Sequence, residues 1–255
     1  NTVKTRVLYA IYDFGGFKMK IGQDYTPSDF EPFAQVAEND NGLDRFGGIS
    51  VAPSGQIAFS FGDFDIALIS NTKQSDKENL DVTMPKIEAA YNYKFGNVSG
   101  KAFAGYQTYK YDNATSDKTV NAYVAGLGVT AAFSPVTLNA VGWFGRNTGE
   151  YGVSKGGSYD VLHDKNSSDF GVAAEVGFEA TKNLIFNVGY GYQRTDIDSA
   201  MKADAQQSYY ANAIITIAKG FYITPEISVL DYMKNSSGNK EGKVFYYGAQ
   251  FKANF

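Results

Sequence analysis

Residues 5–21 read TRVLYAIYDFGGFKMKI, two alternating runs separated by a pair of glycines. The first run, 5–14, places successive side chains on opposite faces, and the second, 17–21, alternates apolar with basic side chains. Alternation with a period of two is typical of a β-strand whose two faces meet different surroundings. Gly15-Gly16 between two such runs predicts a two-residue hairpin turn.

The same unit recurs along the whole chain. Five further pairs of alternating runs join at tight turns, and a last strand, 244–255, follows them: 56–61 with 64–69, 86–95 with 98–109, 121–133 with 136–144, 170–180 with 184–192, and 209–218 with 221–230. The sequence therefore predicts an all-β protein with about thirteen antiparallel strands. We expect residues 1–255 to form a single domain.

Tight turns alternate with long polar connections, which lie at 24–54, 72–84, 110–119, 146–168, 194–207 and 233–242. All short turns must then lie at one end of the sheet and all long loops at the other. Phenylalanines flank the short turns, as a ring girdle at a membrane interface would: Phe14, Phe17, Phe61, Phe64, Phe95, Phe133, Phe178 and Phe221. Both features predict a transmembrane antiparallel β-barrel.

The two faces of the predicted strands differ in polarity. Val172, Val176 and Phe178 alternate with Glu175 and Glu179 in one run. Burying unpaired polar groups costs about 2–7 kcal/mol each, so we interpret the polar face as the lining of a water-filled lumen. The alternative, a one-sided sheet packed as in a lectin-like sandwich, does not explain the turn-and-ring pattern.

Composition excludes several kinds of site. The 255 residues include no Cys and a single His, which excludes disulfides, thiolate metal sites and paired imidazoles, and the formal net charge of −4 gives no reason to expect nucleic acid. His163 lies in a long polar loop, and we expect it to be solvated rather than catalytic. Glu175 and Glu179 are explained by a pore lining, although a catalytic carboxylate pair would use the same residue types.

A calcium site is the remaining alternative, at the loop acids Asp196, Asp198 and Asp204. Their spacing is not that of an EF-hand, and we interpret them as solvated. We therefore expect no enzymatic activity, no metal and no cofactor.

The segment 6–25, RVLYAIYDFGGFKMKIGQDY, and the strand 55–61, GQIAFSF, resemble bacterial general porins, most of all the DcaP-like and related homotrimeric porins. In such porins an Ile-Gly-Gln segment, here Ile21-Gly22-Gln23, ends the fifth strand and leads into the loop that folds into the pore. The resemblance implies a homotrimer in the outer membrane of a Gram-negative bacterium. Small residues at Gly100, Ala102 and Ala104 on a lipid-side face are compatible with close packing of barrels.

Strand direction predicts a longer protein. If the turn at Gly15-Gly16 faces the periplasm, the strand that contains Arg6 starts at the external end, which is not where a complete barrel begins. We expect three upstream strands and sixteen in all, and counting Ile21-Gly22-Gln23 as the end of the fifth strand leads to the same total. The aromatic terminus Phe255 is similar to the signal by which such barrels are inserted, and 244–255 is expected to be the closing strand.

The segment 24–53 is too long for a simple connection, and its Phe30, Phe33 and Phe46 predict that it packs against something. By the resemblance it is the constriction loop inside the lumen. Its charged residues are Asp24, Asp29, Glu31, Glu38, Asp40, Asp44 and Arg45. The strands facing it supply Lys4, Arg6, Lys18 and Lys20, with Lys86 and Lys101 further round.

Opposed acidic and basic walls would set a transverse field across a narrow opening. The alternative is that the loop charges face outward as a solvated cap. The sequence thus predicts a passive diffusion channel for small hydrophilic solutes and ions, and the basic strand cluster favours anionic solutes such as carboxylates. Its expected partners are membrane lipids and lipopolysaccharide. Two other functions remain open: a barrel that sheathes a partner such as an electron-transfer complex, and a surface adhesin.

Overall fold

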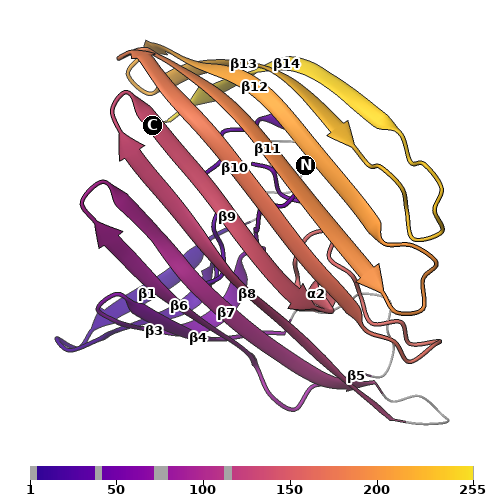
Figure 1. Cartoon of the computed structure of the whole chain (residues 1–255). Helices are drawn as coiled ribbons and strands as arrows, with labels where there is room; N and C mark the ends of the chain where they lie inside the picture. The colour runs from indigo at the N-terminus through magenta and orange to yellow at the C-terminus, as the bar shows by residue number, and fades with distance from the viewer. Residues whose placement is uncertain (1–4, 38–41, 72–79, 112–116, 255) are drawn as a thin grey trace.

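The computed structural model describes residues 5–37, 42–71, 80–111 and 117–254. One antiparallel sheet contains every strand, and the strands pair in chain order except for the short β5, which pairs with β7 (Figure 1). The predicted number of about thirteen strands is confirmed by the thirteen on this path. The strands are β1 (Leu8–Asp13), β2 (Lys18–Asp24), β3 (Ser54–Phe61), β4 (Phe64–Ile69), β5 (Leu80–Asp81), β6 (Lys86–Phe95), β7 (Val98–Tyr111), β8 (Lys118–Phe133), β9 (Val136–Arg146), β10 (Ser167–Thr181), β11 (Leu184–Ile197), β12 (Asp204–Ala218), β13 (Phe221–Asp231) and β14 (Lys243–Ala253).

The tight turns lie where the sequence predicts them. Phe61 pairs with Phe64 across one turn, and Phe95 pairs with Val98 across the next. Figure 1 shows these short turns at one end of the sheet and the long connections at the opposite end. The predicted asymmetry of the two ends is therefore confirmed.

Several strands extend further toward the long loops than the alternation predicts. β11 runs to Ile197, although its apolar alternation stops near Tyr192. The residues that follow, from Gln193 to Asp196, are polar on both faces, yet their pairing with β12 and β10 continues. The hydrophobic period therefore marks only the part of the strand that has an apolar face, because backbone pairing does not require one.

The sheet is strongly curved but open. In the described part of the chain its path ends at β1 on one side and β14 on the other, and these two strands are not paired with each other. β14, predicted as the closing strand 244–255, covers Lys243–Ala253 and pairs with β13, while Phe255 lies outside the described residues. Figure 1 shows a trough, with the chain between β2 and β3 inside it.

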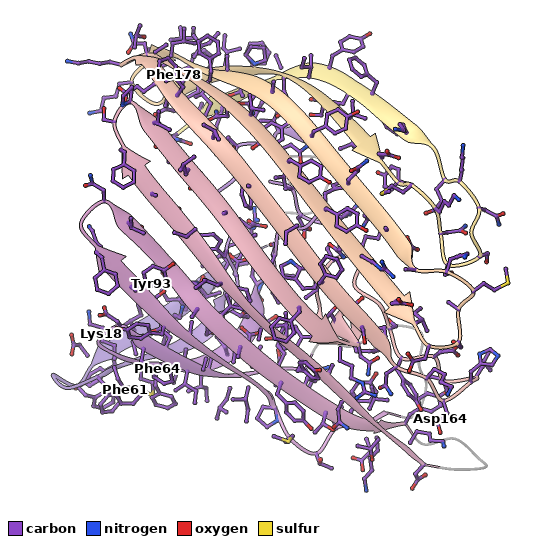
Figure 2. All side chains as sticks on the ribbon, viewed as in Figure 1. Lys18, Phe61, Phe64, Tyr93, Asp164 and Phe178 are labelled. Carbon is purple, nitrogen blue, oxygen red and sulfur yellow. The ribbon has the colours of Figure 1, made fainter. Side chains whose placement is uncertain are left out.

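The outward face carries exposed apolar side chains, as the alternation predicts. Val172, Val176 and Phe178 on β10 are each more than 40% exposed. Aromatic rings gather near the short turns: the rings of Phe14 and Phe17 stack 4.6 Å apart, and Phe17 lies 5.5 Å from Phe61. Figure 2 shows Phe61 and Phe178 at this turn end of the sheet.

The inward face is partly dry, which differs from the predicted water-filled lining. Apolar residues of the segment between β2 and β3 form one buried cluster with inward residues of β7–β13, among them Leu43, Phe46, Trp143 and Tyr210. The prediction of a water-filled lining is wrong for this region, because it considered only water as the hydrogen-bonding partner of the polar wall. Within the described ranges, no helix is long and apolar enough to cross a membrane.

Candidate pore constriction

Residues 25–53, here called the inward loop, cross the concave face of the sheet. The loop leaves the end of β2 and returns at the start of β3, and it contacts strands from β6 to β13 on the way. Three buried glutamates of this inner wall accept hydrogen bonds from loop backbone N–H groups: Glu88 on β6, Glu175 on β10 and Glu226 on β13. Both polar and apolar contacts with the inner wall therefore account for the predicted packing of the loop.

Glu226 makes the most extensive of these contacts. Its carboxylate accepts the N–H of Val36 at 2.7 Å and that of Ala37 at 3.0 Å. The side chains of Asn212 and Ser228 donate to the same carboxylate at 3.0 and 2.5 Å. Only 3% of Glu226 is exposed. Four donors within the protein thus replace the hydrogen bonds to water that this buried carboxylate loses.

Glu175 on β10 repeats the arrangement three strands away. Its carboxylate accepts the N–H of Ala34 at 2.7 Å and the amide of Asn139 at 2.9 Å, and the Tyr210 hydroxyl donates to it as well. Asn139 also donates to the carbonyl of Pro32 at 3.1 Å. The loop segment 32–37 is thus hydrogen-bonded to four strands, β9, β10, β12 and β13.

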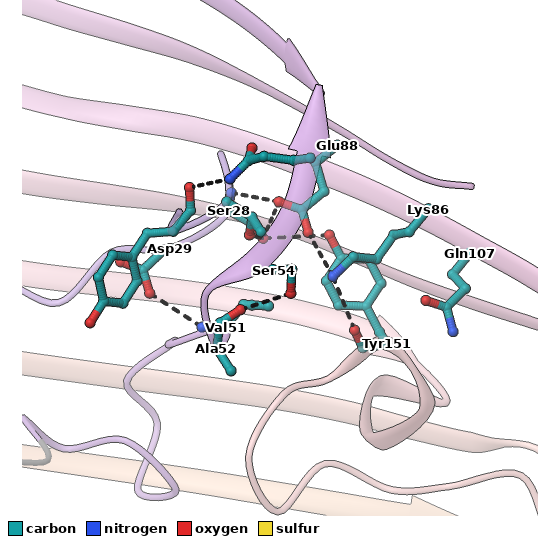
Figure 3. A network of polar contacts seen from close by, with 12 residues as sticks. Ser28, Asp29, Val51, Ala52, Ser54, Lys86, Glu88, Gln107 and Tyr151 are labelled. Atoms are coloured by element: carbon teal, nitrogen blue, oxygen red, sulfur yellow. Dashed lines mark hydrogen bonds and ion pairs between the residues drawn. The ribbon is translucent and has the colours of Figure 1, made fainter. Parts of the chain in front are cut away.

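Glu88 connects the loop to a buried cation (Figure 3). It accepts the N–H and the hydroxyl of Ser28 at 2.9 and 2.8 Å, and Lys86 Nζ lies 3.1 Å from its other oxygen. Both charged side chains are fully buried. Lys86 also lies 4.5 Å from the ring centroid of Tyr151. Lys86 therefore belongs to the contact between wall and loop, not to an open lining.

Glycines of the wall let the loop approach the sheet closely. A Cβ atom on Gly191 would lie 1.9 Å from the carbonyl oxygen of Phe46, and one on Gly128 would lie 2.5 Å from the ring of Phe30. Trp143, the only tryptophan of the chain, donates from Nε1 to the carbonyl of Gly47 at 3.0 Å. Side chains at these glycines would exclude the loop from its present position.

A second segment, residues 147–159, also folds inward, whereas the sequence predicts only one more polar connection there. It contains the short helix α2 (Thr148–Tyr151), all four residues of which are buried. Gln107 on β7 donates to the carbonyl of Glu150 at 3.0 Å, and a Cβ on Gly105 would meet the Tyr151 hydroxyl. The sequence feature that indicates this inward packing is a set of apolar or aromatic residues within a polar loop: Tyr151, Val153 and Tyr159.

The predicted strand cations lie as follows. Lys18 and Lys20 are on the concave face, since they pair through β3 with the face that carries Glu88. Lys20 Nζ is 2.5 Å from Asp24, and Lys18 Nζ is 3.9 Å from Asp13. The Arg6 guanidinium lies 5.3 Å above the ring of Tyr25. Lys4 lies outside the described residues.

The predicted loop acids divide into two groups, those buried in contacts within the protein and those exposed to solvent. Asp29 accepts hydrogen bonds from Ser50 and from the N–H of Val51, both at 3.2 Å, and Lys101 Nζ donates to its backbone carbonyl at 2.9 Å. Burial, followed by the negative charge of Glu31, raises the pKa of the Asp29 carboxyl to about 7. Glu31 itself is exposed.

Asp44 is 8% exposed, and burial raises the pKa of its carboxyl to about 6. Its neighbour Arg45 is partly exposed. Glu38 and Asp40 lie outside the described residues. Asp29 and Asp44 thus serve contacts within the protein, and the predicted acids that lie in the described ranges do not form one continuous wall.

A cavity of about 390 Å³ remains between the inward loop and the inner face of β12–β14. Glu31, Phe33 and Val36 line it from the loop, and Tyr222 and Lys252 line it from the sheet. An acidic loop residue and a basic strand residue thus border the same space. Lys252 is a lining residue that the sequence does not predict, because the alternation of 244–255 indicates a closing strand and nothing more.

His163 and the loop acids considered for metal binding do not line this cavity, whereas Glu175 binds the inward loop. The Asp160 carboxylate oxygen Oδ2 accepts from His163 Nδ1 at 2.7 Å and from Ser199 Oγ at 2.6 Å. Serine and histidine both contact the carboxylate in this arrangement, whereas nucleophilic catalysis requires them to contact each other. Among the described residues, no group of three or more histidines and acids has metal-binding geometry.

Solved structures with the same fold are outer-membrane channels and porins. The chain is similar to the outer membrane channel DcaP of Acinetobacter baumannii, with a TM-score of 0.72, 16% identity, and coverage of 96% of this chain and 72% of that chain. OmpF of Salmonella typhi, solved in complex with daunomycin, matches with a TM-score of 0.66 and 15% identity over 97% of this chain and 77% of that chain. An anion-selective porin from Comamonas acidovorans matches with a TM-score of 0.61 and 11% identity over 96% and 73%.

No family model and no curated protein matches the chain. At these identities the similarity is one of fold, and it covers nearly the whole chain. The chain has the fold of the outer-membrane porins, and the resemblance read from residues 6–25 and 55–61 is confirmed at this level.

We expect Glu226→Ala to release the inward loop. The substitution leaves the N–H groups of Val36 and Ala37 without a carboxylate, and hydrogen bonds to a charged group contribute about 1.5–3 kcal/mol each. The free energy of unfolding should fall by about 3 kcal/mol. Fluorescence of Trp143, now 3% exposed, should shift to the red and become accessible to iodide.

Glu179→Ala is the matched control, because Glu179 is an exposed glutamate on the same face of the sheet, at the turn end of β10. It should leave both measurements unchanged. If Glu226→Ala behaves like this control, the carboxylate does not hold the loop.

Gly191→Ala should displace the loop by steric contact alone. Its Cβ would lie 1.9 Å from a backbone oxygen, which no side-chain rotation relieves. Overpacking of this kind costs about 1–3 kcal/mol, measured as a loss in the free energy of unfolding. Gly142→Ala on β9, where the nearest atom would be 3.8 Å away, should be neutral or slightly stabilising. Equal effects of the two substitutions would contradict the close packing of loop and wall.

Proposed function

We propose that the protein is a passive diffusion channel of a Gram-negative outer membrane for small hydrophilic solutes and ions. The porin fold, the exposed apolar outward face and the polar concave face support this function together. The assignment needs neither a cofactor nor a catalytic group. It also agrees with the role of the buried Lys86–Glu88 ion pair, which attaches the inward loop to the inner wall and performs no chemistry.

One observation carries the proposal: the inward loop is hydrogen-bonded to β6, β10 and β13 by Glu88, Glu175 and Glu226. A loop attached at three places across the concave face narrows the interior to a fixed extent. A fixed narrowing selects solutes by size and charge without a moving part. A barrel that sheathes a threaded partner would need this space to be open.

We propose that the opening is bordered by the predicted charges that remain exposed. Glu31, Lys18 and Arg45 are exposed or partly exposed, and Lys20 forms an ion pair with Asp24. Asp29 and Asp44 act through the shape of the loop instead, because their carboxylates are mostly buried. Arg6 belongs to the same set of predicted charges, whereas Lys4, Glu38 and Asp40 lie outside the described residues.

A homotrimer is the assembly that we propose. One solved structure similar to this chain, OmpT of Vibrio cholerae, is a trimer form, with a TM-score of 0.57 and 12% identity over 96% of this chain and 78% of that one. Ala102 and Ala104 are exposed on the outward face of β7, where small side chains permit close approach of another barrel. Membrane lipids would cover the rest of the outward face.

Liposome swelling tests the channel function. Vesicles that contain the folded protein should swell in isotonic solutions of small sugars and small carboxylates, and more slowly as the solute becomes larger. Protein-free vesicles provide the baseline. Swelling no faster than this baseline for every solute would overturn the proposal in favour of a sheath or an adhesin.

Lys18→Gln combined with Lys20→Gln should change ion selectivity. Removing two cations from the concave face lowers the local concentration of anions, so the ratio of cation to anion permeability should rise. Single-channel currents under a salt gradient measure this ratio. Lys182→Gln with Lys219→Gln, two exposed lysines at short turns, is the control with the same change in charge. Unchanged conductance and selectivity in the first variant would eliminate Lys18 and Lys20 as eyelet residues.

A further inference from the structure

A further cavity, of about 310 Å³, lies on the concave side of the sheet at its long-loop end. Residues 155–158 of the segment that also folds inward line it on one side, and β11, β12 and the connection between β13 and β14 line it on the other. Strand register fixes the face: Gln193 pairs with Gln206, and Gln193 follows Gly191, where a Cβ would meet the inward loop, by two residues. The proposed eyelet uses none of the residues that line this cavity.

Buried hydrogen bonds fix the walls of the cavity. The Asp169 carboxylate on β10 accepts the N–H of Gly157 at 2.8 Å and the hydroxyl of Thr195 at 2.5 Å, and both of these residues line the cavity. Gln193, also a lining residue, donates from Nε2 to the carbonyl of Ser154 at 3.0 Å. The segment 147–159 is therefore attached to β10 and β11, and the cavity between them is a defined part of the fold.

Charges of both signs border the cavity. The cations are Lys155 and Lys202, and the acids are Asp204 and Glu241. Within the described part of the chain, none of these four side chains forms an ion pair. Asp204 nevertheless interacts electrostatically with both Glu241 and Lys155, so the two signs act on the same space. A ligand that carries both charges would supply each side of the cavity with an opposite charge.

Two amide side chains add uncharged hydrogen-bonding groups to the lining. Gln193 is 1% exposed, and its Oε1 has no hydrogen-bond partner among the described residues. Buried polar atoms are normally paired, so an unpaired amide oxygen at a cavity indicates a site for a donor from a ligand or from water. Gln206, its neighbour across the strands, lines the same cavity. Small-molecule sites have volumes of about 300–1,000 Å³, so this cavity suits a ligand at the lower end of that range.

The cavity adjoins the constriction. Tyr232 lines it, and the Tyr232 ring centroid lies 5.7 Å from that of Phe46 in the inward loop. In the orientation that the sequence predicts, with the short turns in the periplasm, the long loops face the exterior. A solute that enters from outside would therefore reach this cavity before the inward loop.

We propose that this cavity binds a zwitterionic solute, an amino acid or a short peptide, before it passes the constriction. Lys155 would bind the carboxylate of the solute, and Asp204 with Glu241 would bind its ammonium group. The amides of Gln193 and Gln206 would pair with a peptide bond. A solute of one charge sign would leave the opposite charges of the cavity without a partner, and a neutral sugar would use neither set. The inference rests on the proposed function, because it names a class of solute that the channel would take up.

Saturation-transfer NMR of the protein in detergent micelles tests the inference with three related probes. Alanyl-alanine is the zwitterion, N-acetyl-alanyl-alanine lacks the ammonium charge, and alanyl-alanine amide lacks the carboxylate. The zwitterion should bind the unmodified protein most tightly, because only this probe pairs with both sets of charges. Asp204→Asn combined with Glu241→Gln should weaken its binding about tenfold, the effect of losing one charge-assisted hydrogen bond.

Two further variants separate the roles of the charges. Lys155→Gln should weaken binding of alanyl-alanine and of its N-acetyl derivative, but it should not weaken binding of the amide, which has no carboxylate. Asp63→Asn with Glu179→Gln is the control for the acid variant, since these two exposed acids at the opposite end of the sheet carry the same charge. This control should leave binding of all three probes unchanged.

Three results would overturn the inference. One is equal affinity of the acid variant and its control for alanyl-alanine, and another is binding of the N-acetyl derivative as tight as that of the zwitterion. The third is unchanged binding of alanyl-alanine by the Lys155→Gln variant. Heat-dependent migration in gels confirms that each variant is folded. Since binding is measured without a conductance, a protein that swells liposomes can fail this test, and one that does not conduct can pass it.

Discussion

The hydrogen bonds from loop backbone N–H groups to buried wall glutamates are the interaction on which this structure depends. A segment of 29 residues between β2 and β3 has many backbone donors and acceptors, and inside a trough they must be paired with something. Glu88, Glu175 and Glu226 supply the acceptors, and Asn139 and Asn212 supply donors. A carboxylate can accept several hydrogen bonds at once, which makes it suitable for binding consecutive N–H groups such as those of Val36 and Ala37.

The same constraint explains the composition of the inner wall. Polar residues on the concave face serve as partners for the loop, and glycines such as Gly191 leave room for its backbone. Between these contacts, Trp143 and Tyr210 form a dry cluster with Leu43 and Phe46. The trough is therefore divided into a packed part under the loop and an open part beside β12–β14.

Much of the architecture could be predicted from residue order alone. Alternation predicts the strands, short breaks of two or three residues between alternating runs predict the turns, and length together with Phe30, Phe33 and Phe46 identifies the loop. The charges of the site were predicted less well. Alternation along the strands places Lys86 and Glu175 on the inner face, which predicts that they line the pore. Alternation does not reveal, however, what covers that face. The loop that contains Tyr151 also folds inward, although its polar sequence predicts one more exterior connection. Neither polarity nor length reveals which face a connection covers.

What the sequence by itself determined is therefore the secondary structure, its order and the polarity of each face, because these depend on neighbours within a few residues. Only the tertiary structure decided which inward charges remain open to a solute and which are buried partners of the loop. The physical reason is that a carboxylate such as Glu226 has the same local sequence signature whether water or the backbone of residues 36–37 occupies its oxygens. That choice depends on a contact about 190 residues away along the chain.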